Sequence, residues 1–424
     1  MNFADKMIML IDKNKRTMLL SMGIIIALII ALTEAKAQNT EGFIYGKVFT
    51  RDNTYQGQLR WGKEEAYWND HFNASKVSNK NRRYKLRKRD EDDDNSWSNF
   101  DWSFSSIWAD KSTTTHQFVT QFGDIAVIEN VSDNRAIITL KNGEEVEVSA
   151  QGYNDLSPSI RVLDDELGEL TIRWSRVERV QFLPTPAKLR PVLGQALFGT
   201  VRTYRKDDLT GYIQWDEDER ISVDKLDGDT RDGDLSISFG KIRSIEGGRN
   251  GSDVELLDGR SFYLSGSNDV NSGNRGIIVT VEGVGKIRVP WKVFNSVTFD
   301  PTVKSSGQAY TKYAPPKPLV GTVYTYNEDE IKGRIVFDLD EAMDIEFLEG
   351  KDDELEYRIP FRNIKSIKPK NYNYSQLKLR NGDTLLLGDM RDVSDNNDGL
   401  LVFQRGSREP EYISWKKIDE IIFD

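Results

Sequence analysis

The residues of this chain that could do chemistry gather in its first third. Glu64, Glu65 and Asp70 lie beside tryptophans, and paired carboxylates can serve as acid and base in glycoside hydrolysis. His71 and His116 are the only histidines, so a serine–histidine–aspartate triad would have to use one of them. No nucleophile elbow, zinc-binding helix, phosphate loop or dinucleotide fingerprint accompanies these residues. We therefore expect the acids to form the polar face of a strand, and we expect no catalytic residue and no enzyme activity.

The composition restricts metals and cofactors in the same direction. The chain has no cysteine, which excludes disulfides, thiolate metal sites and cysteine nucleophiles. Two oxygen-rich segments, 227–234 and 394–399, lack the one-three-five spacing and the downstream bidentate glutamate of an established calcium loop. We expect both segments to be turns, and we expect neither a metal site nor a cofactor.

A group of tryptophans is the main candidate for ligand binding. Two of them precede an insertion near 76–112, and three lie within it. One interpretation makes the insertion a solvated loop whose aromatic residues extend the core. The other makes exposed rings a platform for a sugar ring, a peptide or another envelope protein. The candidate ligand-binding residues are Trp61, Trp68, Trp97, Trp102 and Trp108.

The elements that must position these residues repeat three times along the chain. Each copy opens with two glycine-containing segments of alternating apolar and polar residues, which is the pattern of half-buried strands. The paired glycines are Gly46 and Gly57, Gly199 and Gly211, and Gly321 and Gly333. A Phe-x-x-Ile-x-x-Ile motif follows, beginning at Phe122, Phe239 and Phe361, and each copy closes on a similar motif at Trp174, Trp291 or Trp415. These closing motifs predict a strand, one tight helical turn and a final strand.

The repeat predicts an all-β fold of three tandem modules. Each module is expected to be a pair of small β-barrel or β-sandwich units, and the plan resembles that of small Sm-like barrels. We place the modules at 41–183, 197–300 and 318–424, with the insertion in the first and proline-rich linkers between them. The recurring tryptophans are expected to be core aromatics. The recurring acids are expected to accept hydrogen bonds from turn amides, and they are Asp155, Asp269 and Asp392.

The N-terminal residues 1–37 have the layout of a secretory signal peptide. Lys13, Lys15 and Arg16 precede an apolar run at 18–32, and a small-x-small cleavage site follows at 35–37. The alternative is an uncleaved membrane anchor, although the run is shorter than a typical membrane span. We therefore expect a bacterial protein that is exported to the periplasm, the cell surface or the medium.

Charge and the absence of a catalytic motif bound the function. The net charge is −10 with basic and acidic residues intermixed, which disfavours a nucleic-acid partner. We expect a non-enzymatic binding or scaffolding protein of the bacterial cell envelope, with no membrane span once the signal is cleaved. The alternative is a carbohydrate-binding or carbohydrate-active protein that uses the aromatic and acidic patch of the first module. An envelope protein or a glycan is the expected partner.

Overall fold

Antiparallel strands make up most of the described chain. The computed structural model describes residues 39–77, 116–151 and 155–424, so the expected signal peptide and most of the insertion lie outside it. Within these ranges the chain is all-β, as the sequence predicts, and its helices are three-residue 3₁₀ turns. None of these helices is both long enough and apolar enough to cross a bilayer.

The thirty strands fall into three groups of ten, which we call set 1, set 2 and set 3. Set 1 comprises β1 (Tyr45–Thr50), β2 (Thr54–Trp61), β3 (His71–Lys76), β4 (His116–Gln121), β5 (Ile125–Ser132), β6 (Arg135–Leu140), β7 (Glu145–Ser149), β8 (Ile160–Asp164), β9 (Gly168–Ile172) and β10 (Val177–Phe182). Set 2 comprises β11 (Phe198–Thr203), β12 (Asp208–Gln214), β13 (Lys225–Thr230), β14 (Gly233–Ser238), β15 (Ile242–Gly247), β16 (Gly251–Leu256), β17 (Ser261–Ser265), β18 (Ile277–Val281), β19 (Gly285–Val289) and β20 (Phe294–Phe299). Set 3 comprises β21 (Val320–Thr325), β22 (Glu330–Val336), β23 (Phe347–Asp352), β24 (Leu355–Pro360), β25 (Ile364–Pro369), β26 (Tyr374–Leu379), β27 (Thr384–Gly388), β28 (Leu400–Phe403), β29 (Glu411–Ile413) and β30 (Ile418–Phe423).

The order in which the strands pair is the same in all three sets. Set 1 has the order β4-β3-β7-β6-β5-β10-β1-β2-β8-β9. Adding ten to each strand number gives the pairings of set 2, and adding twenty gives those of set 3. β19, at one end of the pairing order of set 2, also pairs with β24, at the opposite end of the pairing order of set 3, which joins these two sets into one sheet. Neither of the two sheets is closed.

One-turn 3₁₀ helices interrupt the strands where the recurring aromatic motifs occur. They are η1 (Phe122–Asp124), η2 (Trp174–Arg176), η3 (Phe239–Lys241), η6 (Phe361–Asn363) and η8 (Trp415–Lys417). Three further turns are η4 (Asn268–Val270), η5 (Tyr310–Lys312) and η7 (Arg391–Val393). Each of the first five begins with a buried aromatic residue and leads directly into a strand. Trp291 is buried as well, so all three closing tryptophans are core residues.

The paired glycines allow the first two strands of each set to approach their neighbours closely. Gly46 lies opposite Gly57, Gly199 opposite Gly211, and Gly321 opposite Gly333. A Cβ atom at any of these six positions would lie 1.9–2.4 Å from a backbone carbonyl oxygen of the adjoining strand. Because no side chain fits in that space, these positions require glycine for packing rather than for an unusual backbone angle.

The recurring aspartates bind the backbone of a strand rather than of a turn. In each set one carboxylate oxygen accepts a hydrogen bond from the backbone amide of the third residue of the third strand. The three bonds join Asn73 to Asp155 at 2.6 Å, Asp227 to Asp269 at 2.9 Å, and Glu349 to Asp392 at 2.7 Å. The expectation that these aspartates accept hydrogen bonds from backbone amides is therefore confirmed. The donating amides belong to a strand distant in the sequence, however, and not to a nearby turn as expected.

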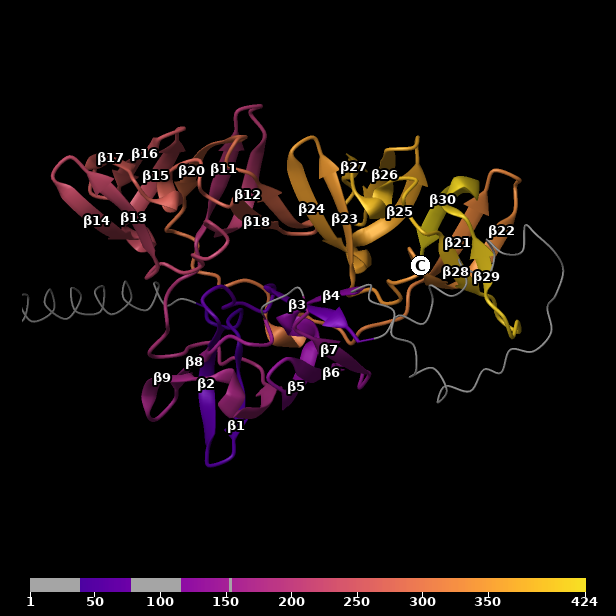
Figure 1. Ribbon diagram of the computed structural model, residues 1–424, viewed down its shortest axis with the longest axis horizontal. Coiled ribbons are helices and arrows are strands. Elements are labelled where there is room, and N and C mark those ends of the chain that lie inside the picture. The colour runs from indigo at the N-terminus through magenta and orange to yellow at the C-terminus, as the bar shows by residue number, and fades with distance from the viewer. Residues whose placement is uncertain (1–38, 78–115, 152–154) are drawn as a thin grey trace, which may run out of the picture.

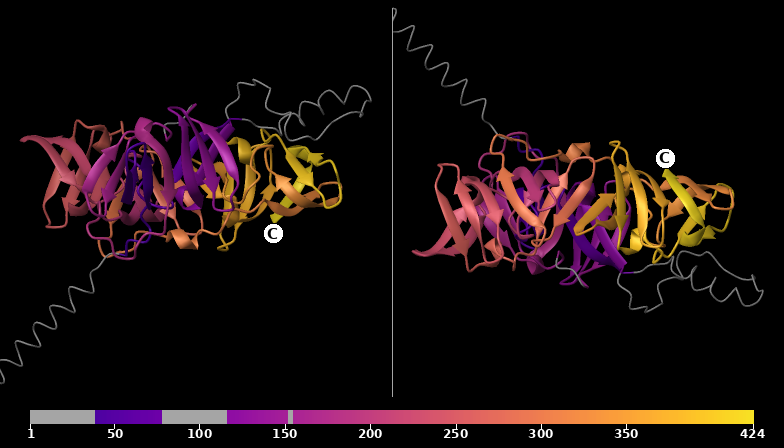
Figure 2. Two further views of the ribbon diagram at one scale, coloured as in Figure 1. Left: turned by 90° about the horizontal axis from the view of Figure 1, so that it is seen from below. Right: turned by 90° about the horizontal axis from the view of Figure 1, so that it is seen from above.

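The three sets pack around a common junction. Sets 2 and 3 lie side by side along the long axis of the molecule, and set 1 lies against the region where they meet (Figures 1 and 2). Sets 2 and 3 share one continuous apolar core. The core of set 1 also takes in Tyr310 and Tyr313 from the segment before set 3, together with Met343 and Ile345 of the loop before β23. This packing brings polar residues from all three sets to one place.

Candidate ligand site at the junction of the three sets

A recurring carboxylate immediately precedes the third strand of each set. It lies nine residues after the aromatic residue that follows or ends the second strand, namely Trp61, Trp215 or Phe337. One carboxylate oxygen accepts hydrogen bonds from two successive backbone amides in the connecting loop, at 2.6–2.9 Å. The three acids are Asp70, Asp224 and Glu346. Each fixes the loop of its own set by the same local geometry.

The second oxygen of each of these acids faces a cation from another set. The three pairs are Asp70 with Arg220 at 3.1 Å, Asp224 with Arg60 at 2.6 Å, and Glu346 with Lys76 at 2.6 Å. Sets 1 and 2 thus exchange an acid and an arginine reciprocally, and sets 1 and 3 are joined by the third pair. Removing one partner of a buried ion pair typically costs 3–5 kcal/mol, roughly, because the other charge is left uncompensated. These contacts therefore hold the three sets in a defined arrangement.

Asp70 lies at the centre of this network. Its side chain and that of Arg220 are each 1% exposed, and the Lys286 ammonium lies 3.6 Å from the same Asp70 oxygen. Burial alone would raise the pKa of Asp70. The charges of Arg220 and Lys286 and the two backbone amides outweigh burial and hold that pKa below its usual value. Asp70 is therefore a carboxylate at neutral pH.

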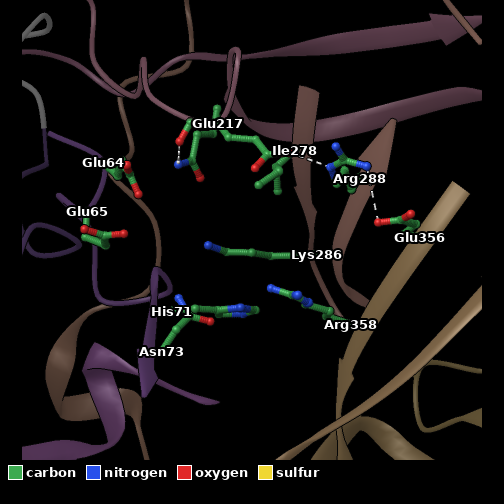
Figure 3. A pocket seen from close by; sticks show the side chains of 11 residues that line it. Glu64, Glu65, His71, Asn73, Glu217, Ile278, Lys286, Arg288, Glu356 and Arg358 are labelled. Atoms are coloured by element: carbon green, nitrogen blue, oxygen red, sulfur yellow. Dashed lines mark hydrogen bonds and ion pairs between the residues drawn. The ribbon is translucent and has the colours of Figure 1, made fainter. Parts of the chain in front are cut away.

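A cavity of about 330 Å³ opens beside Asp70, and all three sets line it. Set 1 contributes acidic and imidazole side chains, set 2 contributes Lys286 and Arg288, and set 3 contributes Glu356 and Arg358. Figure 3 shows Lys286 reaching across the cavity towards Glu64 and Glu65, with His71 and Arg358 on one side of it. Its volume lies within the range of small-molecule sites in proteins.

The pairing of β19 with β24 places two cations opposite each other at this cavity. Lys286 pairs with Arg358, and Arg288 pairs with Glu356. Side chains two residues apart on a strand point to the same face, so both pairs face the cavity. Arg288 bonds to Glu217 and lies 3.3 Å from Glu356, which neutralises its charge. Lys286 and Arg358 are like charges directly opposite each other, an arrangement that destabilises a sheet, and each has one acid of its own, Asp70 at 3.6 Å and Glu349 at 2.8 Å.

Lys286 is buried, and within the described ranges its ammonium has an ion pair but no hydrogen bond. Its exposed fraction is 8%, and its ion-pair partner Asp70 is too distant for a hydrogen bond at 3.6 Å. Burial lowers the pKa of the Lys286 ammonium, while Asp70 and Glu65 oppose that change. Arg358 has an ion pair between its Nε and Glu349 at 2.8 Å, and its side chain is 44% exposed.

His71 also lines the cavity and has unused hydrogen-bonding capacity. Its side chain is 4% exposed, and its Nε2 has no hydrogen-bond partner in the described part of the chain. The ring packs on Phe347 of set 3 with a centroid distance of 4.3 Å. Burial lowers the pKa of His71 well below its usual value, and the charges of Lys286 and Arg358 lower it further. The imidazole is therefore neutral at neutral pH, and its Nε2 can face either a donor or an acceptor.

The two glutamates of the cavity bind protons more tightly than usual. Burial and then Asp218 raise the pKa of Glu64 to about 7. Burial and then Asp155 raise the pKa of Glu65 well above its usual value. A protonated carboxyl group donates one hydrogen bond, so these side chains add donors to the cavity near neutral pH.

The structure brings some of the sequence candidates together and separates others. Glu64, Glu65 and His71 line the cavity, and Asp70 lies directly behind it. Trp61 and Trp68 are fully buried. The indole nitrogen of Trp61 donates to the Asp155 carbonyl at 2.8 Å, and that of Trp68 donates to Thr185 at 3.1 Å. Neither ring offers a face to a ligand, which agrees with the core interpretation of these two residues. The remaining three candidates, Trp97, Trp102 and Trp108, lie outside the described residues.

Sequence reasoning did not find Lys286, Arg358, Asp224 or Glu346, and it singled out Asp70 only as one of three acids beside tryptophans. A signal for the acids is present, because each follows an aromatic residue by nine positions and a glutamate by five. No comparable signal marks Lys286 and Arg358, which occupy ordinary strand positions.

Comparisons with known proteins give no further assignment. No family model matches the chain, and no curated protein or solved structure matches it significantly. Within the described ranges, no group of three or more histidines and acids is arranged to hold a metal ion. The chemistry of the cavity is therefore read from its own side chains.

Proposed function

We propose that this chain is a non-enzymatic binding protein whose ligand occupies the junction cavity. The observation that carries the proposal concerns two groups that line one cavity: among the described residues, the buried His71 Nε2 has no hydrogen-bond partner, and the Lys286 ammonium has only its 3.6 Å ion pair with Asp70. A buried polar group without a partner costs free energy, on the order of 1–3 kcal/mol. A bound ligand would supply the missing partners and recover this free energy on binding.

The architecture supports a scaffold of three tandem modules, each made of open strand units instead of closed barrels. Three features recur in each set and support duplication of one ancestral unit. They are the order in which the strands pair, the pair of opposed glycines, and the acid just before the third strand. We propose that the chain acts in the bacterial cell envelope after export, with residues 1–37 as the signal peptide. Localisation of a tagged chain, with and without 1–37, tests this part. Retention of the intact chain in the cytoplasm would contradict it.

Ligand binding at the junction is testable by thermal unfolding of the purified chain against a library of small polar molecules. A ligand that binds only the folded state raises the unfolding temperature by mass action. We expect at least one compound to stabilise the wild type and to stabilise Lys286→Met less. Lys292→Met is the matched control, because Lys292 is an exposed lysine of the same set that pairs with Glu354. Equal stabilisation of both variants would place the ligand elsewhere, and no stabilisation by any compound would contradict the proposal.

A carbohydrate-active protein is the second candidate, and the raised pKa of Glu64 and Glu65 favours it. A proton-bearing carboxyl group in a cavity can act as the general acid of a glycosidase. Release of a chromophore from aryl glycosides, lost in Glu64→Gln and in Glu65→Gln, would support it. A glycan array with the wild type and with a Trp97/Trp102/Trp108→Ala variant tests the aromatic platform. The carbohydrate proposal fails if neither protein binds a glycan and no glycoside is cleaved.

A further inference from the structure

We infer that the junction cavity binds a small anionic molecule through its carboxylate or phosphate group, with Lys286 and Arg358 as its cationic contacts and His71 Nε2 as a third polar contact. This inference rests on the proposed function, because it names the ligand class of the same cavity. It uses one side chain from each of the three sets.

The distribution of charge at the junction favours an anion. Arg220 is paired with Asp70, and Arg288 is paired with Glu217 and Glu356. Lys286 is left with a distant ion pair, and it lies opposite Arg358 in the strand pair. An anion between these two cations would convert a repulsive pair into two charge-assisted contacts, which are the strongest class of hydrogen bond in proteins.

Arg358 keeps donors for such a ligand. Its ion pair with Glu349 joins Nε to the carboxylate at 2.8 Å. Among the described residues, no hydrogen bond is made by its two terminal nitrogens. A guanidinium whose terminal nitrogens are free can present two parallel donors to a carboxylate or a phosphate.

The acids of the cavity do not oppose this assignment. Four glutamates line the cavity, and two of them, Glu217 and Glu356, pair with Arg288. Burial raises the pKa of Glu64 to about 7 and that of Glu65 well above its usual value, so their protonated forms are available near neutral pH to donate to ligand oxygens. The buried Lys286 ammonium would repel a cationic ligand at short range. A molecule that carries one anionic group and neighbouring hydroxyl groups would match both the cations of the cavity and its two glutamates with raised pKa values.

Isothermal titration calorimetry with four hexoses of one ring type tests the ligand class on the full chain. Glucuronate and glucose 6-phosphate carry the two anionic groups, glucose is neutral, and glucosamine is cationic. Citrate and inorganic phosphate serve as anions without a sugar ring. We expect one or more of the anions to bind at least tenfold more tightly than glucose and glucosamine. Comparison of glucuronate with glucose 6-phosphate, and of citrate with phosphate, separates a carboxylate from a phosphate ligand.

Variants locate the anion within the cavity. We expect Lys286→Met to weaken anion binding by roughly 10- to 100-fold, the loss of one charge-assisted contact. His71→Phe, which keeps a ring against Phe347, is expected to weaken it by a smaller factor of roughly 3- to 10-fold. Lys292→Met is expected to bind as the wild type does. Circular dichroism and urea midpoints check that each variant is folded, and Lys286→Gln replaces Lys286→Met if the latter unfolds.

The outcomes separate the two levels of the proposal. Tight binding of an anion that depends on Lys286 supports the inference. Binding of glucose or glucosamine in preference to every anion overturns it and leaves the proposed function standing. The inference is also overturned if anion affinity is the same in Lys286→Met and the wild type. If these six probes and the thermal-unfolding library all fail to bind, both the inference and the proposed function are wrong.

Discussion

The substitution Asp70→Asn tests the buried network that joins the three sets. An asparagine oxygen can still accept the two backbone hydrogen bonds from Ala66 and Tyr67, so the loop of set 1 keeps its local geometry. The substitution removes only the negative charge that faces Arg220 and Lys286. Its amide nitrogen is a donor and cannot accept from either cation.

The expected loss follows from the burial of the group. Asp70 and Arg220 are both 1% exposed, so solvent does not screen the charge that is left behind. Removing one partner of a buried pair costs about 3–5 kcal/mol of unfolding free energy. The pKa of Asp70 is lowered in the folded state, so its stabilising effect is present above the ordinary value of 3.8 and is lost as the pH falls through the lower, folded value. The difference between wild type and variant should therefore shrink on acidification below about pH 4.

Urea unfolding followed by tryptophan fluorescence measures this loss, and a double-mutant cycle with Arg220→Met isolates the pair. We expect the double variant to be more stable than the sum of the two single effects implies, with a coupling energy of about 2 kcal/mol or more. Glu169→Gln, which breaks an exposed pair with Arg161, is the control and should leave the midpoint nearly unchanged. A loss below about 1 kcal/mol for Asp70→Asn, or zero coupling, would refute the assignment of this pair as a main contact between sets 1 and 2.

Two further substitutions test other parts of the fold. Burial and then Asp269 raise the pKa of Glu219 to about 8, so the stability that this group contributes is full below 4.5 and is lost as the pH rises through 8. The Gln side chain of Glu219→Gln stays neutral at every pH. We therefore expect this variant to have an unfolding free energy about 1–3 kcal/mol above that of the wild type at pH 9, and a similar one at pH 5. An equal effect at both pH values would contradict the raised pKa. Gly211→Ala places a Cβ atom 2.1 Å from the Thr280 carbonyl oxygen, and we expect it to lower the unfolding free energy measured in urea by roughly 1–3 kcal/mol. The control is Ser236→Ala on the exposed face of β14, which should leave the unfolding free energy nearly unchanged. Similar effects of the two substitutions would show that the close approach is absent.

Local structure was predictable from the sequence because its causes are local. Gly-x-Val-x-Thr segments alternate in polarity, and they form the first strand of each set. The Phe-x-x-Ile motif predicts a tight turn between two strands, and one-turn 3₁₀ helices occur at Phe122, Phe239 and Phe361. The recurring tryptophans are buried because the equivalent residue packs into the apolar core in each set.

The junction could not be predicted, since its residues meet only through packing of the sets. Lys286 and Arg358 lie opposite each other because β19 pairs with β24. The polarity pattern of a strand does not predict that it will pair with a strand of another set. In the sequence, Asp70 looks like part of a polar strand face, and Asp224 and Glu346 have no distinguishing feature. Only the folded structure shows that the second oxygen of each acid faces another set. In the sequence, Glu64 and Glu65 stand out as charged residues. Burial raises their pKa values, so their protonated forms can donate hydrogen bonds near neutral pH.

The pKa of His71, measured by NMR of its imidazole nitrogens, tests most directly whether the three sets converge on one cavity in which Lys286 and Arg358 lie near the buried His71 ring. The chain has only two histidines, so a His116→Gln variant assigns the spectrum. Burial, Lys286 and Arg358 together lower the pKa of His71, so the ring should stay neutral well below pH 6.5, and Lys286→Met should raise its pKa. A His71 that titrates near 6.5 in the wild type, unaffected by Lys286→Met, would show that the cavity at the junction does not exist as described.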